Sequence, residues 1–462
     1  MQRLFAICWL TWKAALRFRL FLVVAVLLLA SVVVLPLMIK DDGTARGFTQ
    51  ILLTYTLTTL SALLGLSTLW LACGTLARDI EDCQMQVVAV KPIARWQIWL
   101  GKWLGILSLN AVLLALSGVC VYGLLMWRAN GLPASEQKIL HNEVLVARGS
   151  AKPRSHAQEI EAATERLVKE RLKKYPLDKD SLADVRKQIR EQVKAEFQIV
   201  PPGYSRTWEI DLGLARYRLR DQPIYLRIKF NSAEKSPSGT FGGVWAVGVP
   251  NKTALWGGDE MMSLAPDTFH EFQIAPNLFD ADGVLTVTFG NPNNTTLLVP
   301  LEDGIEVLYR EGGFGMNFAR GLGIILCWMA LLAAVGLASA SFLSFPVAAF
   351  FSLGLLSMVL SSGTMANAVS EGTIADYNAE KGTKGWSPAD VVVIPAFKGA
   401  LKIINLAKGF SPVESLSAGR SITWSELALA FGQIVGLLGG AAAVLGMVVF
   451  TRRELATAQG TH

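Results

Sequence analysis

Charged residues are scarce in this chain. They make up 17% of its 462 residues, whereas hydrophobic residues make up 52%. In a soluble protein of this length about a quarter of the residues are normally charged, so the composition favours a membrane protein. The formal net charge is only +6, and the basic residues cluster beside apolar segments. Such clusters indicate membrane orientation and contact with lipid rather than nucleic-acid binding, and we expect no nucleic-acid partner.

Cysteine and histidine are rare as well. The five cysteines lie in or beside apolar segments, and residues 128–316 contain none, which excludes a disulfide framework there. The four histidines show no paired metal-ligand spacing. Acidic pairs such as Asp280 with Asp282 lie at glycine-containing turns, where aspartate usually serves the turn itself. We therefore expect no catalytic residues and no metal site, with calcium at these turns as the alternative.

A phosphate-binding loop is also missing. That motif requires a glycine-rich loop ending in Gly-Lys-Ser or Gly-Lys-Thr after a strand, but Gly101-Lys102 is followed by Trp103 beside an apolar segment. We therefore expect that the chain is not an enzyme and holds no cofactor.

Long apolar segments dominate the rest of the sequence. A bilayer core about 30 Å thick requires about 20 apolar residues per helix. Six segments meet this length: 20–39, 49–76, 103–127, 321–342, 347–366 and 427–450. Phe342–Pro346 separates the fourth from the fifth and predicts a tight helical hairpin. Residues 1–19 place apolar side chains at helical spacing among basic ones, which favours a helix in the membrane interface.

Lysines and arginines in short loops predict the orientation. Basic clusters precede the first segment, separate the second from the third, and follow the sixth. With six spans, all three clusters lie on one side, the cytoplasmic side. The predicted domains are spans in 20–127, 317–366 and 424–452, a cytoplasmic loop at 77–102, a tail at 453–462, and outside segments at 128–316 and 367–423. We expect a bacterial inner membrane protein with a large periplasmic domain.

The first outside segment has two patterns. Residues 155–198 repeat apolar positions at helical spacing around Pro176, which predicts a charged helical hairpin. Residues 204–310 contain short alternating runs separated by Gly, Pro, Asn and Asp, which predict an antiparallel β-sandwich. The predicted fold is therefore an all-α membrane part of six helices with an inserted α+β domain whose sandwich is jelly-roll-like. Trp208, Trp245 and Trp256 are expected in its core, with a sugar-binding platform as the alternative.

The second outside segment, 367–423, predicts a helix rather than a span. Ser387, Pro388 and Asp390 are typical of a helix start. Pro395 then interrupts an apolar run that carries Lys398 and Lys402. This pattern indicates a kinked helix at, or partly within, the outer interface.

The cytoplasmic loop has the most informative charges. Asp79, Glu81 and Asp82 precede an apolar run, and Lys91-Pro92 leads to Arg95. These charges are available to a cytoplasmic partner, although an ordinary positive-inside loop fits the spacing equally well.

The loop resembles that of type-2 ABC transporter permeases, in which an acidic cluster leads through a KPxxR turn to a Gly-Lys at the start of the third helix. Several later motifs are similar too: Phe410-Ser411-Pro412, Ala418-Gly419-Arg420, Trp424-Ser425-Glu426-Leu427 and Phe450-Thr451-Arg452-Arg453-Glu454-Leu455. The resemblance covers residues 1–127 and 318–455. The insert between the third and fourth helices departs from the compact pattern of that family.

The resemblance implies a half-transporter that pairs with a second permease subunit, identical or different, and docks a cytoplasmic ABC ATPase, which binds ATP and Mg²⁺. It implies that one set of residues couples to the ATPase: Asp79, Glu81, Lys91, Pro92, Arg95 and Lys102. We expect an exporter. The alternative is a mechanotransmission or sensory complex that acts through its outer domain on a periplasmic protein or glycan. A membrane-anchored binding protein or enzyme is a third possibility, but six spans exceed what an anchor requires.

Hydroxyl groups are frequent in the second apolar segment. Thr54, Thr58 and Ser61, together with Asn110 in the third segment, are candidates for a translocation route. Such residues also serve close helix packing, which is the interpretation that we favour. Membrane lipid is the remaining expected partner.

Overall fold

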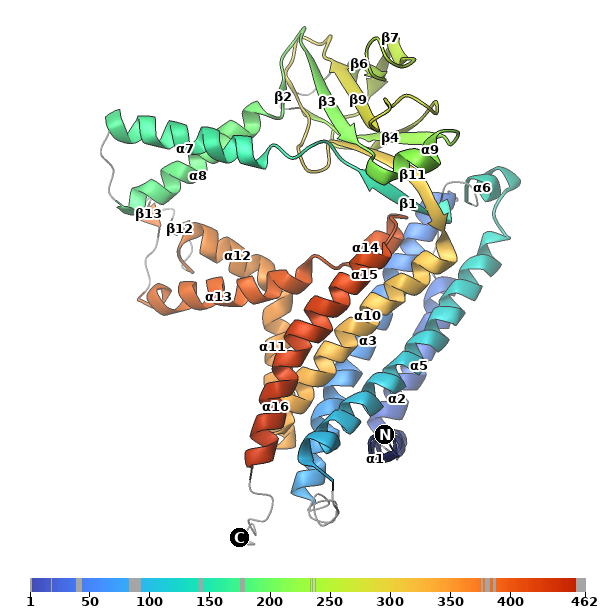
Figure 1. Cartoon of the computed structure of the whole chain (residues 1–462), viewed down its shortest axis with the longest axis vertical. Helices are drawn as coiled ribbons and strands as arrows, with labels where there is room; N and C mark the ends of the chain where they lie inside the picture. Colours follow the sequence, from blue (N-terminus) through green and yellow to red (C-terminus); the bar gives the residue numbers. More distant parts are fainter. Residues whose placement is uncertain are drawn as a thin grey trace. The chain divides into compact units, whose positions relative to one another are not determined.

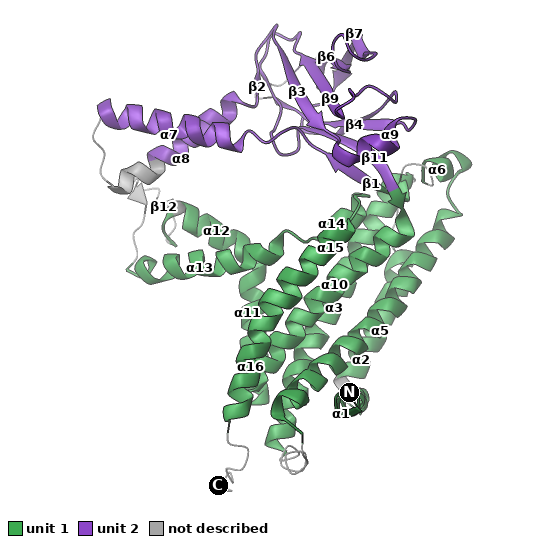
Figure 2. Cartoon of the chain, in the orientation of Figure 1, with its two compact units in different colours: residues 1–147, 312–462 green, residues 148–311 purple. Residues whose placement is uncertain are grey.

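The computed structural model describes residues 2–17, 19–38, 44–82, 93–140, 144–174, 179–232, 234, 236, 238–374, 377–378, 383–384 and 388–453. The chain divides into two compact units (Figure 2). The helical unit comprises Met1–Ala147 and Gly312–His462, and the insert unit comprises Arg148–Glu311. The predicted combination of a membrane helical part and a β-rich domain is confirmed.

Five stretches of the described residues are long and apolar enough to span a membrane, which fits a membrane protein. Four are single helices: α2 (Arg19–Met38), α3 (Ala45–Glu81), α5 (Arg95–Ala129) and α10 (Phe314–Ala340). The fifth is continuous from α15 (Trp424–Ala430) through the π-helix η3 (Phe431–Gly439) to α16 (Gly440–Arg452). Figure 1 shows these helices side by side in one bundle.

The span predicted at 347–366 is a broken helix. α11 (Phe345–Leu360) has 16 residues, a length of about 24 Å at 1.5 Å per residue, which is short of a bilayer core. It bends by 57° into α12 (Ser362–Glu371). Ser361, Ser362 and Gly363 lie at the bend, and such small residues are a common cause of helix kinks.

The remaining elements of the helical unit are shorter or lie beside the bundle. They are α1 (Gln2–Arg17), α6 (Ala134–Ile139), α13 (Asp390–Lys408), α14 (Pro412–Ser417), and the strand pair β12 (Tyr377–Asn378) and β13 (Thr383–Lys384). α13 is the helix predicted from Ser387, Pro388 and Asp390, and it contains Pro395. Ser387 itself lies outside the described residues.

Two apolar clusters form the core of the helical unit, mainly from α3, α5 and α10. α1 packs on α5 at Gly101 and Gly105, which are spaced as in a G-x-x-x-G motif. A Cβ atom on Gly101 would lie 2.8 Å from Cβ of Ile7, and one on Gly105 would lie 2.7 Å from Cβ of Thr11. The two glycines therefore permit a close approach that larger residues would block.

The insert unit contains the predicted helical hairpin and an antiparallel β-sandwich. α7 (Ala157–Lys174) and α8 (Lys179–Glu196) form the hairpin, which is held by Ile160, Val168, Ile189 and Val193. The sandwich consists of one strand before the hairpin and seven after it: β1 (Val146–Ala151), then β3 (Ser205–Asp211), β4 (Ile224–Ile228), β6 (Phe241–Val247), β7 (Trp256–Leu264), β8 (His270–Ile274), β9 (Val284–Gly290) and β11 (Ile305–Gly313).

The strands form two four-stranded sheets, with the orders β1-β11-β4-β8 and β3-β9-β6-β7. A smaller sheet joins β2 (Ile199–Val200), β10 (Leu297–Leu298) and β5 (Asn231–Ser232), and two short helices, η2 (Gly213–Ala215) and α9 (Arg216–Leu219), follow β3. Both large sheets contribute to one core. Trp245 and Trp208 are 1% and 6% exposed there, and Trp256 packs against the same core, as the core interpretation predicts.

Candidate functional site

The candidate site is one end of the helical unit, where α3 ends, α5 begins, α10 turns into α11, and α16 ends (Figure 1). We call it the basic end because Arg78, Arg95, Lys102 and Arg453 lie there. The segment 83–92 connects α3 to α5 at this end and lies outside the described residues, as do the predicted coupling residues Lys91 and Pro92.

Lys102 joins the first turns of α5 to the last turns of α3. Its Nζ atom donates a hydrogen bond to Oδ2 of Asp79 at 2.5 Å and another to the carbonyl oxygen of Thr75 at 2.8 Å. The side chain of Lys102 is only 7% exposed, whereas that of Asp79 is 31% exposed. A buried ammonium group requires such partners because burial removes its hydration. The pair therefore fixes α5 against α3 beside the predicted coupling loop.

Glu81 joins the end of α3 to the start of α11. Its Oε1 atom accepts a hydrogen bond of 2.8 Å from the backbone N–H of Phe345, the first residue of α11. A carboxylate at this position satisfies a free N–H group and complements the positive end of the helix dipole. The guanidinium carbon of Arg78 lies 4.5 Å from the centre of the Phe345 ring. The centres of the Phe345 and Trp70 rings are 5.2 Å apart.

Arg95 joins the start of α5 to the end of α16. Its Nη1 atom donates to the carbonyl oxygens of Phe450, Thr451 and Arg453 at 3.3, 2.7 and 2.8 Å. These carbonyls belong to the last helical turn, where intrahelical donors run out and the dipole is negative. Arg453 in turn donates to the carbonyl oxygen of Ser341 at 3.1 Å, at the end of α10.

The structure thus brings four of the six predicted coupling residues to one end: Asp79, Glu81, Arg95 and Lys102. Each contacts another part of the chain, and the two that flank 83–92 bind the ends of α11 and α16. The contact of Arg453 with Ser341 was not predicted from the sequence. No local pattern could have indicated a contact between residues 112 positions apart.

The candidate route residues lie in different environments. Asn110 is 1% exposed and donates to Oγ1 of Thr68 at 2.8 Å, which packs α5 against α3. Thr58 is exposed, and Thr54 and Ser61 are half-buried. The Oγ atom of Ser61 has no hydrogen-bond partner within the described part of the chain. The hydrogen bond of Asn110 joins two helices, and a translocation route through these four residues stays a prediction.

A buried polar cluster that the sequence did not suggest connects α3, α10 and α11. Ser352 Oγ lies 3.1 Å from Ser339 Oγ and 3.5 Å from the sulfur of Cys73. All three side chains are buried, so these contacts hold α11 against the bundle on the N-terminal side of its bend.

No protein-family model, curated protein or solved structure matches the chain. A functional assignment therefore depends on the residues and contacts of the chain itself.

Proposed function

We propose that the chain is the membrane subunit of an ABC-type exporter, powered by a separate cytoplasmic ATPase that carries ATP and Mg²⁺. In this proposal the basic end faces the cytoplasm of a bacterium, the insert unit is periplasmic, and α11 with α12 is a sixth, broken span. A second permease subunit completes the transporter.

One observation carries the proposal: both flanks of 83–92 bind the ends of distant helices. Glu81 binds the start of α11 and Arg95 binds the end of α16, while Lys102 holds the two flanks together through Asp79. A force on the segment would therefore reach α3, α5, α11 and α16 at once. An ordinary positive-inside loop requires only exposed basic residues and no such contacts.

The proposal is tested with the full chain purified from native membranes in a mild detergent. We expect a copurifying protein with a phosphate-binding loop, and ATP hydrolysis in the complex. Lys91→Glu reverses a charge in the proposed docking segment, so it should abolish both the copurification and the hydrolysis. Lys398→Glu, an exposed change on α13, should leave both unchanged. Equal ATPase recovery from the two variants would exclude docking at this segment.

A second candidate, mechanotransmission to the insert unit without a transported substrate, is favoured by the packing of polar groups. Asn110 pairs with Thr68, and Ser352 pairs with Ser339, so these groups serve contacts between helices rather than a polar route. The two candidates differ in reconstituted vesicles. ATP hydrolysis that changes the protease sensitivity of the insert unit, without vesicle uptake or release of any cell-extract compound, supports mechanotransmission.

We also infer a jelly-roll topology for the sandwich. Two sheets of four strands, in which each sheet mixes early and late strands of the chain, support it because two interlocked Greek keys produce such orders.

A further inference from the structure

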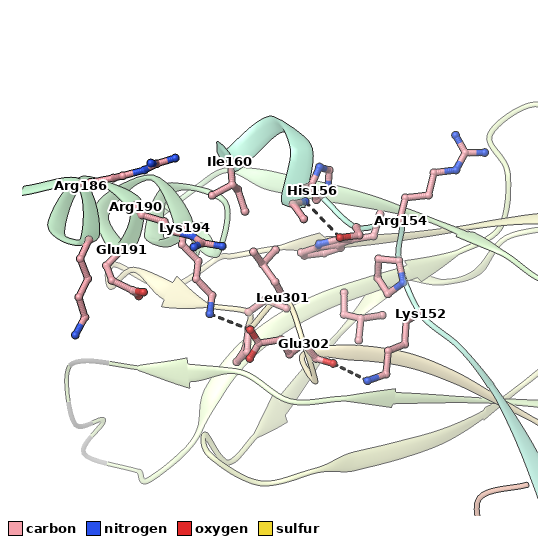
Figure 3. A pocket seen from close by; sticks show the side chains of 18 residues that line it. Lys152, Arg154, His156, Ile160, Arg186, Arg190, Glu191, Lys194, Leu301 and Glu302 are labelled. Atoms are coloured by element: carbon pink, nitrogen blue, oxygen red, sulfur yellow. Dashed lines mark hydrogen bonds and ion pairs between the residues drawn. The ribbon is translucent and has the colours of Figure 1, made fainter. Parts of the chain in front are cut away.

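A basic cleft of about 910 Å³ lies inside the insert unit, between the helical hairpin and the sandwich (Figure 3). One wall is α8, and the others are residues 152–157 and the turn around Leu301. Six lysines and arginines line it: Lys152, Arg154, Arg186, Lys187, Arg190 and Lys194. The acidic members of the lining are Glu191 and Glu302, so positive charge predominates.

The floor of the basic cleft is apolar. Ile160, Trp208, Val299 and Ile305 line it although each is less than 8% exposed, and the half-buried Leu301 packs beside the hairpin core. In Figure 3 the labelled Ile160 and Leu301 lie between the basic side chains of α8 and those of the opposite wall. The cleft therefore offers an apolar surface bordered by cations on both sides.

Arg186 is paired with Glu161 at 2.6 Å, but other cations of the cleft are held weakly. Arg190 lies 3.9 Å from Glu161, and Arg154 lies 3.7 Å from Glu209, in pairs whose side chains are 40–65% exposed. Exposed pairs of this kind contribute little to stability. Lys187 is exposed and makes no ion pair with another described residue. These groups can turn to a ligand at little cost.

Glu302 occupies the middle of the cleft as an internal counterion. Its carboxylate accepts from Lys194 at 2.9 Å, and its backbone carbonyl accepts from Lys152 at 2.8 Å. Figure 3 shows the two lysines reaching Glu302 from opposite sides. The Glu302 side chain is 79% exposed, so an incoming anion can displace its carboxylate from Lys194.

We propose that the basic cleft binds an anionic amphiphile, namely a phosphate group carried on an apolar body. Lysine and arginine bind phosphate through charge-assisted hydrogen bonds, and the apolar floor accommodates the attached body, as in other ligand pockets. A free phosphate ion satisfies the cations but makes no apolar contact with the floor. Every residue involved belongs to the insert unit, so the proposal stands apart from the assignment of the chain as a transporter.

The test uses the full chain in phosphatidylcholine nanodiscs and isothermal titration calorimetry. The probe is dihexanoyl phosphatidate, compared with dihexanoyl phosphatidylcholine and inorganic phosphate. We expect saturable binding of the phosphatidate and no saturable binding of the phosphatidylcholine. The dissociation constant of inorganic phosphate should be at least about tenfold higher than that of the phosphatidate. Equal affinity for phosphatidate and inorganic phosphate would identify a plain anion site and overturn the proposal.

Variants locate the binding. Lys187→Ala with Arg190→Ala should weaken phosphatidate binding about tenfold or more, since each removed cation contributes a charge-assisted contact. Lys169→Ala with Arg171→Ala makes the same charge change on the exposed surface of α7, outside the cleft, and should leave the affinity unchanged.

A substitution at Glu302 should have the opposite effect on phosphatidate affinity. Glu302→Gln removes the competing carboxylate and should strengthen phosphatidate binding several-fold. Unchanged circular dichroism in all variants verifies folding. Equal weakening by the two double variants, or weaker binding in Glu302→Gln, would place the phosphatidate elsewhere on the protein.

Discussion

The Lys102–Asp79 pair should respond unequally to removal of its two partners. In Asp79→Ala the ammonium group of Lys102, whose side chain is 7% exposed, loses its carboxylate. Loss of one partner at a fully buried ion pair costs about 3–5 kcal/mol, and the carbonyl of Thr75 remains as an acceptor. We therefore expect a loss of about 3 kcal/mol in the free energy of unfolding.

Lys102→Met should cost less. Methionine keeps most of the side-chain volume, and the orphaned carboxylate of Asp79 is 31% exposed, so water can solvate it. We expect a loss of about 1 kcal/mol. The double variant leaves no orphaned charge and should be less destabilised than Asp79→Ala alone, which is a strong departure from additivity.

The assay is titration of the detergent-solubilised chain with sodium dodecyl sulfate, followed by circular dichroism. Lys398→Met, at an exposed position of α13, controls for the lysine-to-methionine change and should not move the midpoint. Equal losses in the two single variants, or simple additivity in the double variant, would refute the reasoning from burial.

Three further predictions use the same titration, the second of them also as a function of pH. Gly105→Val should destabilise the chain by about 1–3 kcal/mol because its Cβ would collide with α1. A Cβ at Gly123 would meet nothing within 4 Å, so Gly123→Val should be nearly neutral. The N–H of Val284 holds the pKa of Asp280 below its usual 3.8, so this carboxylate stabilises the fold at neutral pH and ceases to do so as the pH falls through its lowered pKa. Asp280→Asn should therefore reduce stability at pH 7, and this loss should shrink as the solution is made more acidic than the usual pKa. Arg95→Gln removes the donors at the end of α16 and should cost about 1–2 kcal/mol, with no change in m-value.

Hydropathy predicted the four longest single helices because a span requires only a sufficient apolar length. It could not predict the break at Ser361, since averaging over 347–366 conceals a bend that lies at three small residues. The same limit applies to η3, because the sequence Phe431–Gly439 is apolar and glycine-rich whether its hydrogen bonds are of the α or the π type.

The charges of the basic end were visible in the sequence, but their partners were not. Glu81 and Phe345 are 264 positions apart, and Arg95 and Thr451 are 356 apart, so only the fold brings them together. The basic cleft was missed for a related reason. Lys187 and Arg190 are typical of a solvated helix face, and only the packing of α8 beside the sandwich places them over an apolar floor.

The central claim is that the segment between α3 and α5 docks an ATPase, and cross-linking from inside that segment tests it most directly. A photoreactive amino acid is placed at Val88 of the full chain in native membranes, and the same group at Ser238 in the insert unit is the control. Irradiation should join position 88 to a protein with a phosphate-binding loop, with a yield that changes when ATP is added, while position 238 should not capture that protein. Cross-links from position 88 to lipid alone would contradict the account.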